Sequence, residues 1–164
     1  MEREEVLEIC KAHGKSILDI GVGPMAVIAA KEFDCRVSCI DVNKVALERE
    51  LENVRTKGLD EMIALEWADA TDLPYPDSSF DVVISYGALH HTPVEGRDRF
   101  LLEAFRVAAE RLCVIEYRKS TFPHDESEFR VVDIYWLEHS LRNLGRIEKH
   151  CGREMDMYIC FKER

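Results

Sequence analysis

Two acids and two glycines near the N-terminus have the types and the spacing of a site for a nucleoside cofactor. Asp19, Gly21 and Gly23 end a short apolar run of strand type and precede a helical pattern. Glycines at such a turn let a ligand approach the backbone, and the helix N-terminus behind them favours negative charge. Asp41 follows the first glycine by about 20 residues, at the end of the next strand, where a carboxylate can bind ribose hydroxyls. Together these residues predict a bound nucleoside.

Two cofactors fit this spacing, and Asp19 discriminates between them. Gly21, Gly23 and Ala26 match the dinucleotide fingerprint, which predicts NAD. The run Asp19-x-Gly21-x-Gly23 instead resembles the first motif of class I S-adenosylmethionine-dependent methyltransferases. A carboxylate at the strand end would repel a pyrophosphate, whereas the cationic amino group of S-adenosyl-L-methionine gives Asp19 a partner. The resemblance favours S-adenosyl-L-methionine, with one departure: Met25 stands where the family usually has a third glycine.

The resemblance extends over nearly the whole chain. Residues 67–91 contain WADA, LPYPDSSFDVVIS and YGALHH, which look like the small-molecule methyltransferases related to ubiquinone and menaquinone biosynthesis enzymes. It implies that Asp69 accepts a hydrogen bond from the adenine amino group and that Ser85 and Tyr86 lie against the methionine end. Asp69 could instead cap its own loop, and Tyr86 could be only a partly buried aromatic residue. The cofactor-binding set implied is Asp19, Gly21, Val22, Gly23, Asp41, Val42, Asp69, Ala70, Ser85 and Tyr86.

No residue is a firm catalytic candidate, because methyl transfer from an activated donor depends chiefly on alignment of the reactants. The candidates are Tyr86, His90, His91 and Glu116. Either histidine could accept a proton near neutral pH, or could instead pack a loop or a helix entry. Adjacent histidines generally point in different directions, and no nearby acid or cysteine completes a metal set, so no metal is predicted. Glu116 could orient a polar acceptor.

Composition and charge disfavour several classes of partner. The formal net charge is −10, from 22 basic and 32 acidic residues, which disfavours a nucleic-acid footprint and suits a small-molecule acceptor. Six cysteines without a C-x-x-C pair indicate reduced thiols in the cytoplasm. No apolar run is long enough to span a membrane. The length predicts a single domain over residues 1–164.

The hydrophobic pattern alternates strands with helices, which predicts an α/β fold whose parallel sheet is covered on both faces. The family resemblance implies a Rossmann-like, doubly wound sheet of about seven strands in the order 3-2-1-4-5-7-6, closed by an antiparallel hairpin. The Pro-Gly-Gly turn common in the family before the fifth strand is absent, so a different turn is expected there. The expected strands are residues 16–20, 36–40, 62–66, 80–85, 112–117, 146–151 and 155–162. The expected helices are residues 2–13, 25–33, 43–57, 96–109 and 134–144, the last capped by Asp133.

The acceptor side is expected to be open. Many relatives carry an N-terminal helical cap that builds the acceptor pocket, and only a short segment precedes the first motif in this sequence. The long polar loop that contains His124, Asp125 and Glu126 could be a lid or an ordinary solvated loop. The expected walls of the acceptor site are residues 2–13, 86–96 and 118–131.

Three functions remain as hypotheses. The first is S-adenosylmethionine-dependent methyl transfer to a small-molecule acceptor. The second is a non-catalytic nucleoside-binding subunit of a complex, and the third is an NAD-dependent oxidoreductase. Binding of S-adenosylhomocysteine rather than NAD would separate the third from the first two, and methyl transfer would separate the first from the second.

Overall fold

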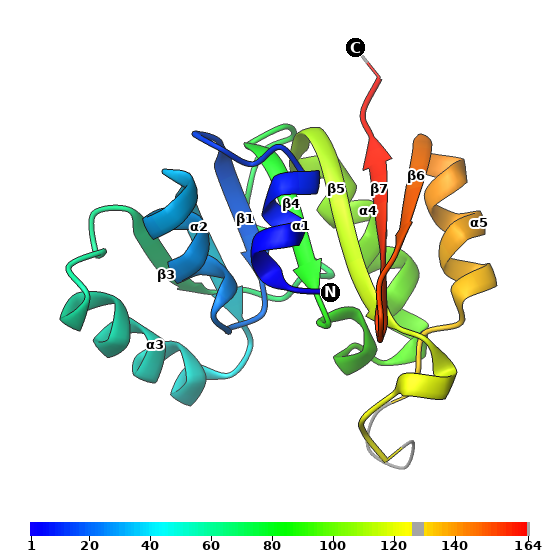
Figure 1. Cartoon of the computed structure of the whole chain (residues 1–164), viewed down its shortest axis with the longest axis horizontal. Coiled ribbons are helices and arrows are strands. Elements are labelled where there is room, and N and C mark those ends of the chain that lie inside the picture. Colours follow the sequence, from blue (N-terminus) through cyan, green and yellow to red (C-terminus); the bar gives the residue numbers. More distant parts are fainter. Residues whose placement is uncertain (126–129, 164) are drawn as a thin grey trace.

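One seven-stranded sheet forms the centre of the computed structural model, which describes residues 1–125 and 130–163 (Figure 1). The strands are β1 (Ser16–Ile20), β2 (Arg36–Asp41), β3 (Ile63–Trp67), β4 (Phe80–Tyr86), β5 (Ala108–Tyr117), β6 (Arg146–Cys151) and β7 (Met155–Phe161). Their order is β3-β2-β1-β4-β5-β7-β6. Neighbours from β3 to β5 are parallel, whereas β7 is antiparallel to both β5 and β6. The predicted fold class and strand order are confirmed.

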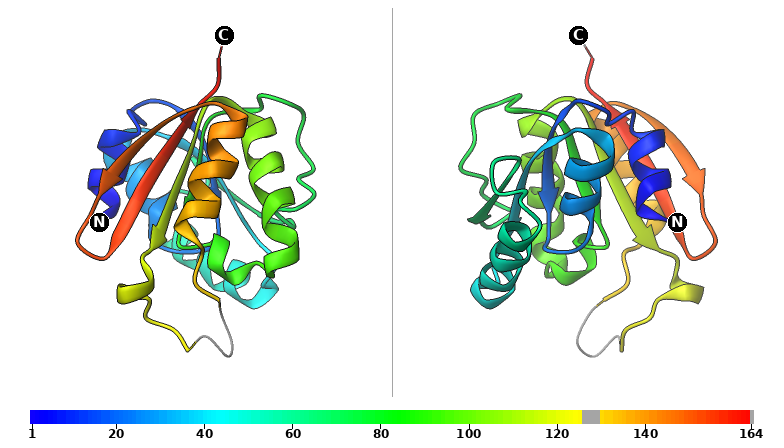
Figure 2. Two further views of the ribbon diagram at one scale, coloured as in Figure 1. Left: turned by 90° about the vertical axis from the view of Figure 1, so that its right-hand side faces the viewer. Right: turned by 60° about the vertical axis from the view of Figure 1, so that its left-hand side comes forward.

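Helices cover both faces of the sheet (Figure 2). They are α1 (Arg3–Ile9), α2 (Met25–Phe33), α3 (Lys44–Thr56), α4 (Arg97–Val107) and α5 (Ile134–Leu144), with the 3-10 turns η1 (Leu89–His91), η2 (Val94–Gly96) and η3 (Lys119–Thr121). Helices α1, α2 and α3 contribute to one buried cluster, and α4 and α5 contribute to the other. Among the described residues, no helix has the length and apolar character needed to cross a bilayer.

The central strands are apolar on both sides because each side meets a helical layer. In β1, Ile17 belongs to the cluster under α1 and α2, while Leu18 belongs to the cluster under α4 and α5. In β4, Ile84 and Val83 divide in the same way. Successive strand side chains point to opposite faces, so a strand buried on both faces reads as a continuous apolar run. Packing on both faces holds the central strands in place, and with them the residues at the strand ends.

Polar caps start two of the helices where the sequence predicted. The Asn43 side chain accepts a hydrogen bond from the backbone N–H of Ala46, three residues on, at 3.1 Å. Asp133 accepts from two backbone N–H groups in the first turn of α5, at 2.9 and 3.2 Å. Gly58, with a φ of +68°, follows α3 in the left-handed conformation that favours glycine. These helix boundaries are confirmed.

Two predicted helix ends were wrong. Helix α4 ends at Val107 and the chain passes directly into β5 at Ala108, although the helix was predicted to residue 109 and the strand from residue 112. No glycine turn is needed, because the Lys162 ammonium donates to three backbone carbonyls at this junction at 2.8 to 3.0 Å. Helix α1 ends at Ile9 rather than at residue 13, since Lys11 adopts a φ of +51°.

Candidate functional site

A cavity of about 770 Å³ lies at the C-terminal ends of β1, β2 and β4. Its volume falls within the range of about 300 to 1,000 Å³ typical of ligand sites. Open α/β sheets bind their ligands at this edge, where the strand order reverses between β1 and β4. The lining includes nine of the ten residues predicted to bind the cofactor, namely Asp19, Gly21, Val22, Gly23, Asp41, Val42, Asp69, Ala70 and Tyr86.

Ser85 is the tenth predicted residue, and it does not line the cavity. It is fully buried in β4, in register with Ile20 and Val114 on the two neighbouring strands. Its hydroxyl has no hydrogen-bond partner among the described residues. The fourth strand was predicted to end at Ser85, but β4 continues through Tyr86. Tyr86 is therefore the first residue of this segment that lines the cavity.

The glycine turn is held against the end of β2. Gly21 has a φ of +97°, and its N–H donates to the Ile40 carbonyl at 2.8 Å. A side chain at Gly21 would be strained by this φ and would bring a Cβ within 3.4 Å of the Ala88 Cβ. The next N–H, that of Val22, donates to the Asp41 carboxylate at 2.9 Å. Met25, in the place of the third glycine, is buried at the start of α2 and lines the cavity.

Asp41 therefore has a structural role in addition to its expected ligand role. Its Oδ2 accepts from Val22 N–H and its Oδ1 accepts from Asn43 N–H at 2.8 Å. Each carboxylate oxygen can accept more than one hydrogen bond, so both remain able to accept from ribose hydroxyls. The two backbone bonds fix the carboxylate in the cavity wall. The sequence predicted Asp41 as either a ribose ligand or a turn residue, and the geometry allows both.

Asp19 is a buried carboxylate near the end of β1, two residues before Gly21. Its Oδ2 has no hydrogen-bond partner among the described residues, although Asp19 lines the cavity. Burial raises the pKa of the Asp19 carboxyl to about 8, and the nearby Arg3 guanidinium only partly offsets this rise. A buried acceptor without a partner is costly. A cationic ligand in the cavity would supply the partner that the chain does not.

Arg3 and Tyr86 form a wall of the cavity, and both lie in ranges that were expected as walls, 2–13 and 86–96. The Arg3 guanidinium carbon lies 4.4 Å from the centroid of the Tyr86 ring, within the range of cation–π contacts. The Tyr86 hydroxyl donates to the Met1 carbonyl at 2.6 Å. These contacts fix the start of α1 beside the turn. No motif marks Arg3, because its position depends on how α1 packs against the sheet.

Asp69 caps its own loop and also faces the cavity. Its Oδ1 accepts from the backbone N–H of Thr71 at 2.9 Å and from the Thr71 hydroxyl at 2.8 Å. The structure thus contains the loop-capping interaction that was the alternative to an adenine contact. Because Asp69 is exposed and lines the cavity, the adenine contact stays a prediction.

Glu116 contacts a histidine rather than the cavity. Its Oε2 lies 2.9 Å from His90 Nδ1, and its Oε1 accepts from the His90 backbone N–H at 3.1 Å. Both side chains are buried, and neither lines the cavity. Glu116 therefore fixes the position and the ring orientation of His90 in η1. Its predicted role in orienting an acceptor is not supported by any contact with the cavity.

His91 lines the cavity and is the candidate base that a ligand could reach. Partial burial lowers the pKa of His91, and the neighbouring His90 and His124 rings lower it further. The neutral form, which accepts a proton, is therefore favoured. Tyr86 also lines the cavity, whereas His90 is buried behind it.

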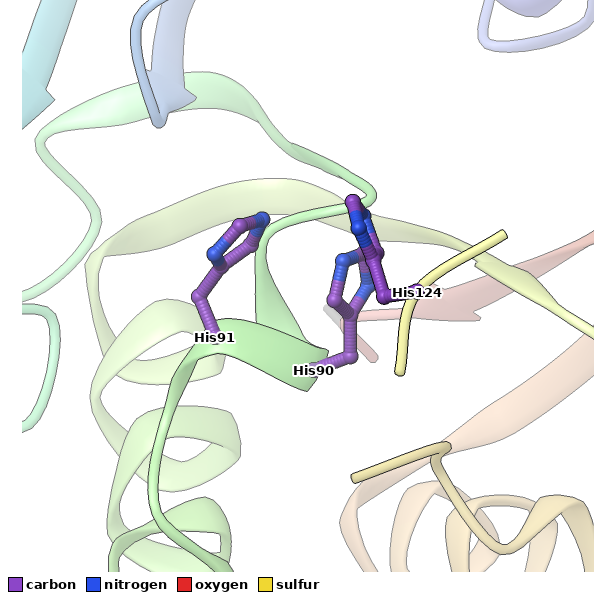
Figure 3. A group of neighbouring side chains, drawn as sticks. All are labelled: His90, His91 and His124. Atoms are coloured by element: carbon purple, nitrogen blue, oxygen red, sulfur yellow. The ribbon is translucent and has the colours of Figure 1, made fainter. Parts of the chain in front are cut away.

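The loop after β5 brings a third histidine to this pair (Figure 3). The His124 ring centroid lies 5.1 Å from that of His90 and 5.9 Å from that of His91. The expectation that nothing nearby completes a metal set overlooked His124, which is distant in sequence and adjacent only after folding. Residues 126–129 of the expected lid loop, including Glu126, lie outside the described residues.

Comparison with known proteins identifies relatives of the cofactor-binding part of the chain. A family model described as a methyltransferase domain matches residues 17–111. A 27-O-demethylrifamycin SV methyltransferase from Amycolatopsis mediterranei is 39% identical over 82 residues, 49% of this chain and 30% of its own length. An ajmaline N-methyltransferase from Rauvolfia serpentina is 28% identical over 103 residues, 62% of this chain and 35% of its own. The matches thus span about a third of these relatives.

Solved structures share the whole fold. A SAM-dependent methyltransferase from Aquifex aeolicus has a TM-score of 0.79 at 20% identity, covering 98% of this chain and 89% of its own. The [4+2]-cyclase SpnF has a TM-score of 0.77 at 26% identity, covering 90% of this chain and 58% of its own. The chain therefore belongs to the methyltransferase-domain family, and it has the fold of a SAM-dependent methyltransferase.

Proposed function

We propose that the protein transfers a methyl group from S-adenosyl-L-methionine to a small-molecule acceptor. The observation that carries this proposal is the buried carboxylate of Asp19, which has one oxygen without a partner among the described residues in the wall of the cavity. This oxygen suits a cationic amino group, whereas the pyrophosphate of NAD would keep the carboxyl protonated and would leave the oxygen without a donor. The third hypothesis, an NAD-dependent oxidoreductase, is therefore disfavoured by the same atom.

The residues of the chain have distinct tasks in binding this cofactor. Asp19 is the counter-charge for the ammonium, and it gives up its proton when the cation binds. Asp41 accepts from the ribose hydroxyls, and Asp69 accepts from the adenine amino group. The glycine turn leaves room for the backbone to approach the ligand. Together these contacts fix the cofactor at the edge of the sheet.

The reaction itself needs alignment more than acid–base chemistry. When bound, S-adenosyl-L-methionine would supply an activated methyl group, whose transfer to a nucleophile forms a bond at the methyl carbon, breaks its bond to sulfur and leaves S-adenosylhomocysteine. Tyr86 and Arg3 form one side of the cavity wall, where the Arg3 guanidinium lies against the Tyr86 ring. His91 is placed to accept a proton from an acceptor that loses one, and its lowered pKa keeps the imidazole neutral.

Several observations support a small-molecule acceptor. The names of two relatives give 27-O-demethylrifamycin SV and ajmaline as substrates of those proteins. The net charge of −10 opposes a nucleic-acid partner. The six cysteines, which include no C-x-x-C pair, support a reducing cytoplasmic location.

Labelled methyl transfer tests the proposal. The protein is incubated with S-adenosyl-L-methionine that carries a radioactive methyl group and, separately, with the small-molecule and macromolecular fractions of a cell extract. We expect label in the small-molecule fraction, and none with the Asp19→Asn variant. Cofactor binding without transfer to either fraction would favour the non-catalytic hypothesis, and label in macromolecules would refute the acceptor class. Turnover has to be measured directly, because SpnF shares this fold and is named as a cyclase.

A further inference from the structure

Three histidine rings from two segments of the chain meet beside the cofactor cavity. His90 and His91 are consecutive in η1, and His124 reaches them from the loop that follows η3 (Figure 3). The ring centroids of His90 and His91 are 4.4 Å apart. One potential ligand nitrogen from each of the three rings lies within 4.8 Å of the others. Among the described residues, this group has the composition and the proximity of a metal site.

Glu116 gives this cluster the second feature of a metal site. Histidines that bind metals usually donate their other ring N–H to a carboxylate or a carbonyl, which fixes the tautomer and orients the ring. The Glu116 carboxylate lies 2.9 Å from His90 Nδ1, and both side chains are buried. In that tautomer the ligand atom of His90 is Nε2. The Glu116–His90 pair therefore resembles the carboxylate–histidine arrangement that supports a bound cation.

We propose that His90, His91 and His124 bind a divalent transition-metal ion, with Glu116 as the positioning residue for His90. Imidazole ligands suit zinc, nickel, copper and iron, and cobalt replaces zinc in such sites. Two nitrogens bound to zinc at about 2.0 to 2.1 Å lie at most about 4.2 Å apart. Binding therefore includes a small rotation of the rings of His91 and His124, which are exposed, around the buried His90.

The ion would stand where an acceptor has to enter. His91 belongs both to the histidine group and to the lining of the cavity. An ion with three protein ligands keeps an open position, as catalytic zinc sites do. That position would take an acceptor with an oxygen or nitrogen lone pair and hold it by the ion. In the metal-bound protein His91 would act as a ligand and no longer as the proton acceptor. This second step rests on the proposed methyl transfer, whereas binding of the ion does not.

Titration with Co²⁺ tests the site directly, because its visible absorption bands distinguish nitrogen from sulfur ligands. The wild-type protein should bind one Co²⁺ with a spectrum that lacks sulfur-to-metal charge transfer. The His91→Ala and His124→Ala variants should each weaken binding by about tenfold or more. His139→Ala is the matched control, since His139 is exposed on α5 and lies outside the group. Charge-transfer bands, equal loss in the control, or no binding would each overturn the proposal.

Glu116→Gln tests the positioning role. The variant keeps the shape of the side chain but removes the charge, and it should weaken Co²⁺ binding by about 10- to 100-fold while leaving the nitrogen-type spectrum. Unchanged Co²⁺ affinity would refute the role of Glu116. Calorimetry with S-adenosylhomocysteine on the same preparations separates the two proposals: normal S-adenosylhomocysteine binding without Co²⁺ binding overturns the metal site alone. Co²⁺ binding without S-adenosylhomocysteine binding overturns only the proposed methyl transfer.

Discussion

The cavity has two halves that the chain builds in different ways. The cofactor half consists of Asp19, the glycine turn and Asp41, which are close in sequence and joined by backbone hydrogen bonds. The histidine half consists of His91, which lines the cavity, and of His90, His124 and Glu116, which lie beside it; these residues come from three separate segments. The first half is a local turn at the end of two adjacent strands. The second exists only when the loop after β5 lies against η1, so its geometry depends on tertiary packing.

The largest expected effect is a loss of cofactor affinity on substitution of Asp19. It would show whether the two halves bind their ligands independently. Asp19→Asn keeps the shape of the side chain but removes the counter-charge for the cofactor ammonium. Removing one partner of a buried ion pair costs about 3 to 5 kcal/mol, so cofactor affinity should fall by at least about a hundredfold. Isothermal calorimetry with S-adenosylhomocysteine measures this loss. Co²⁺ binding by the histidine half should remain unchanged, and a parallel loss there would contradict their independence.

The pH dependence of the free energy of unfolding tests whether the Asp19 carboxyl is protonated in the folded protein without ligand. Its pKa is about 8 in the folded protein against an ordinary value of 3.8, so the folded state holds one more proton between these limits. The stability that Asp19 contributes is therefore complete below about 3.8 and is lost as the pH rises through about 8. The free energy of unfolding of the wild type, relative to Asp19→Asn, should fall by up to about 1.4 kcal/mol per pH unit in this interval.

Urea denaturation of the two ligand-free proteins at several pH values measures this difference. A difference that is independent of pH would mean that Asp19 is ionised in the folded state and has a partner other than the cofactor.

Asp41 should give a smaller loss of affinity together with a loss of stability. Asp41→Ala removes the acceptor for the Val22 and Asn43 N–H groups as well as the ribose contact. At about 1.5 to 3 kcal/mol for a hydrogen bond to a charged group, cofactor binding should weaken by at least about tenfold. Asp41→Asn should lose less. Thermal melting and calorimetry on both variants are needed, and a large melting loss with normal affinity would assign Asp41 to the turn alone.

The smallest expected effect on cofactor binding is at Asp69, which lines the cavity next to the cofactor half. Its carboxylate is exposed and already accepts from Thr71, so Asp69→Ala should weaken cofactor binding by about tenfold and leave the fold intact. Asp72→Ala is a matched control, because Asp72 lies on the same loop but does not line the cavity. Equal affinities in the two variants would leave Asp69 with its loop-capping role only.

The contrast between the halves explains what the sequence could predict. The α/β fold class and the position of the cavity could be predicted, because glycine turns, strand ends and helix caps are local features, and nine of the ten residues predicted to bind the cofactor line that cavity. The strand order came from the family resemblance. The ranges 2–13 and 118–131 were expected beside the acceptor, but the contacts of Arg3 with Tyr86 and of His124 with His90 could not be predicted, since they are long-range contacts that no sequence spacing marks. The direct passage from α4 into β5 was missed for the same reason, because the cap is Lys162 from the far end of the chain.

A comparison of two ligands by calorimetry tests the central claim most directly. S-adenosylhomocysteine and NAD are titrated separately into the wild-type protein and into Asp19→Asn under the same conditions. We expect S-adenosylhomocysteine to bind the wild type, to lose at least about a hundredfold in affinity with Asp19→Asn, and NAD to bind neither protein. NAD binding that is retained or strengthened in Asp19→Asn, with no response to S-adenosylhomocysteine in the wild type, would contradict the assignment of the buried carboxylate to a cationic cofactor.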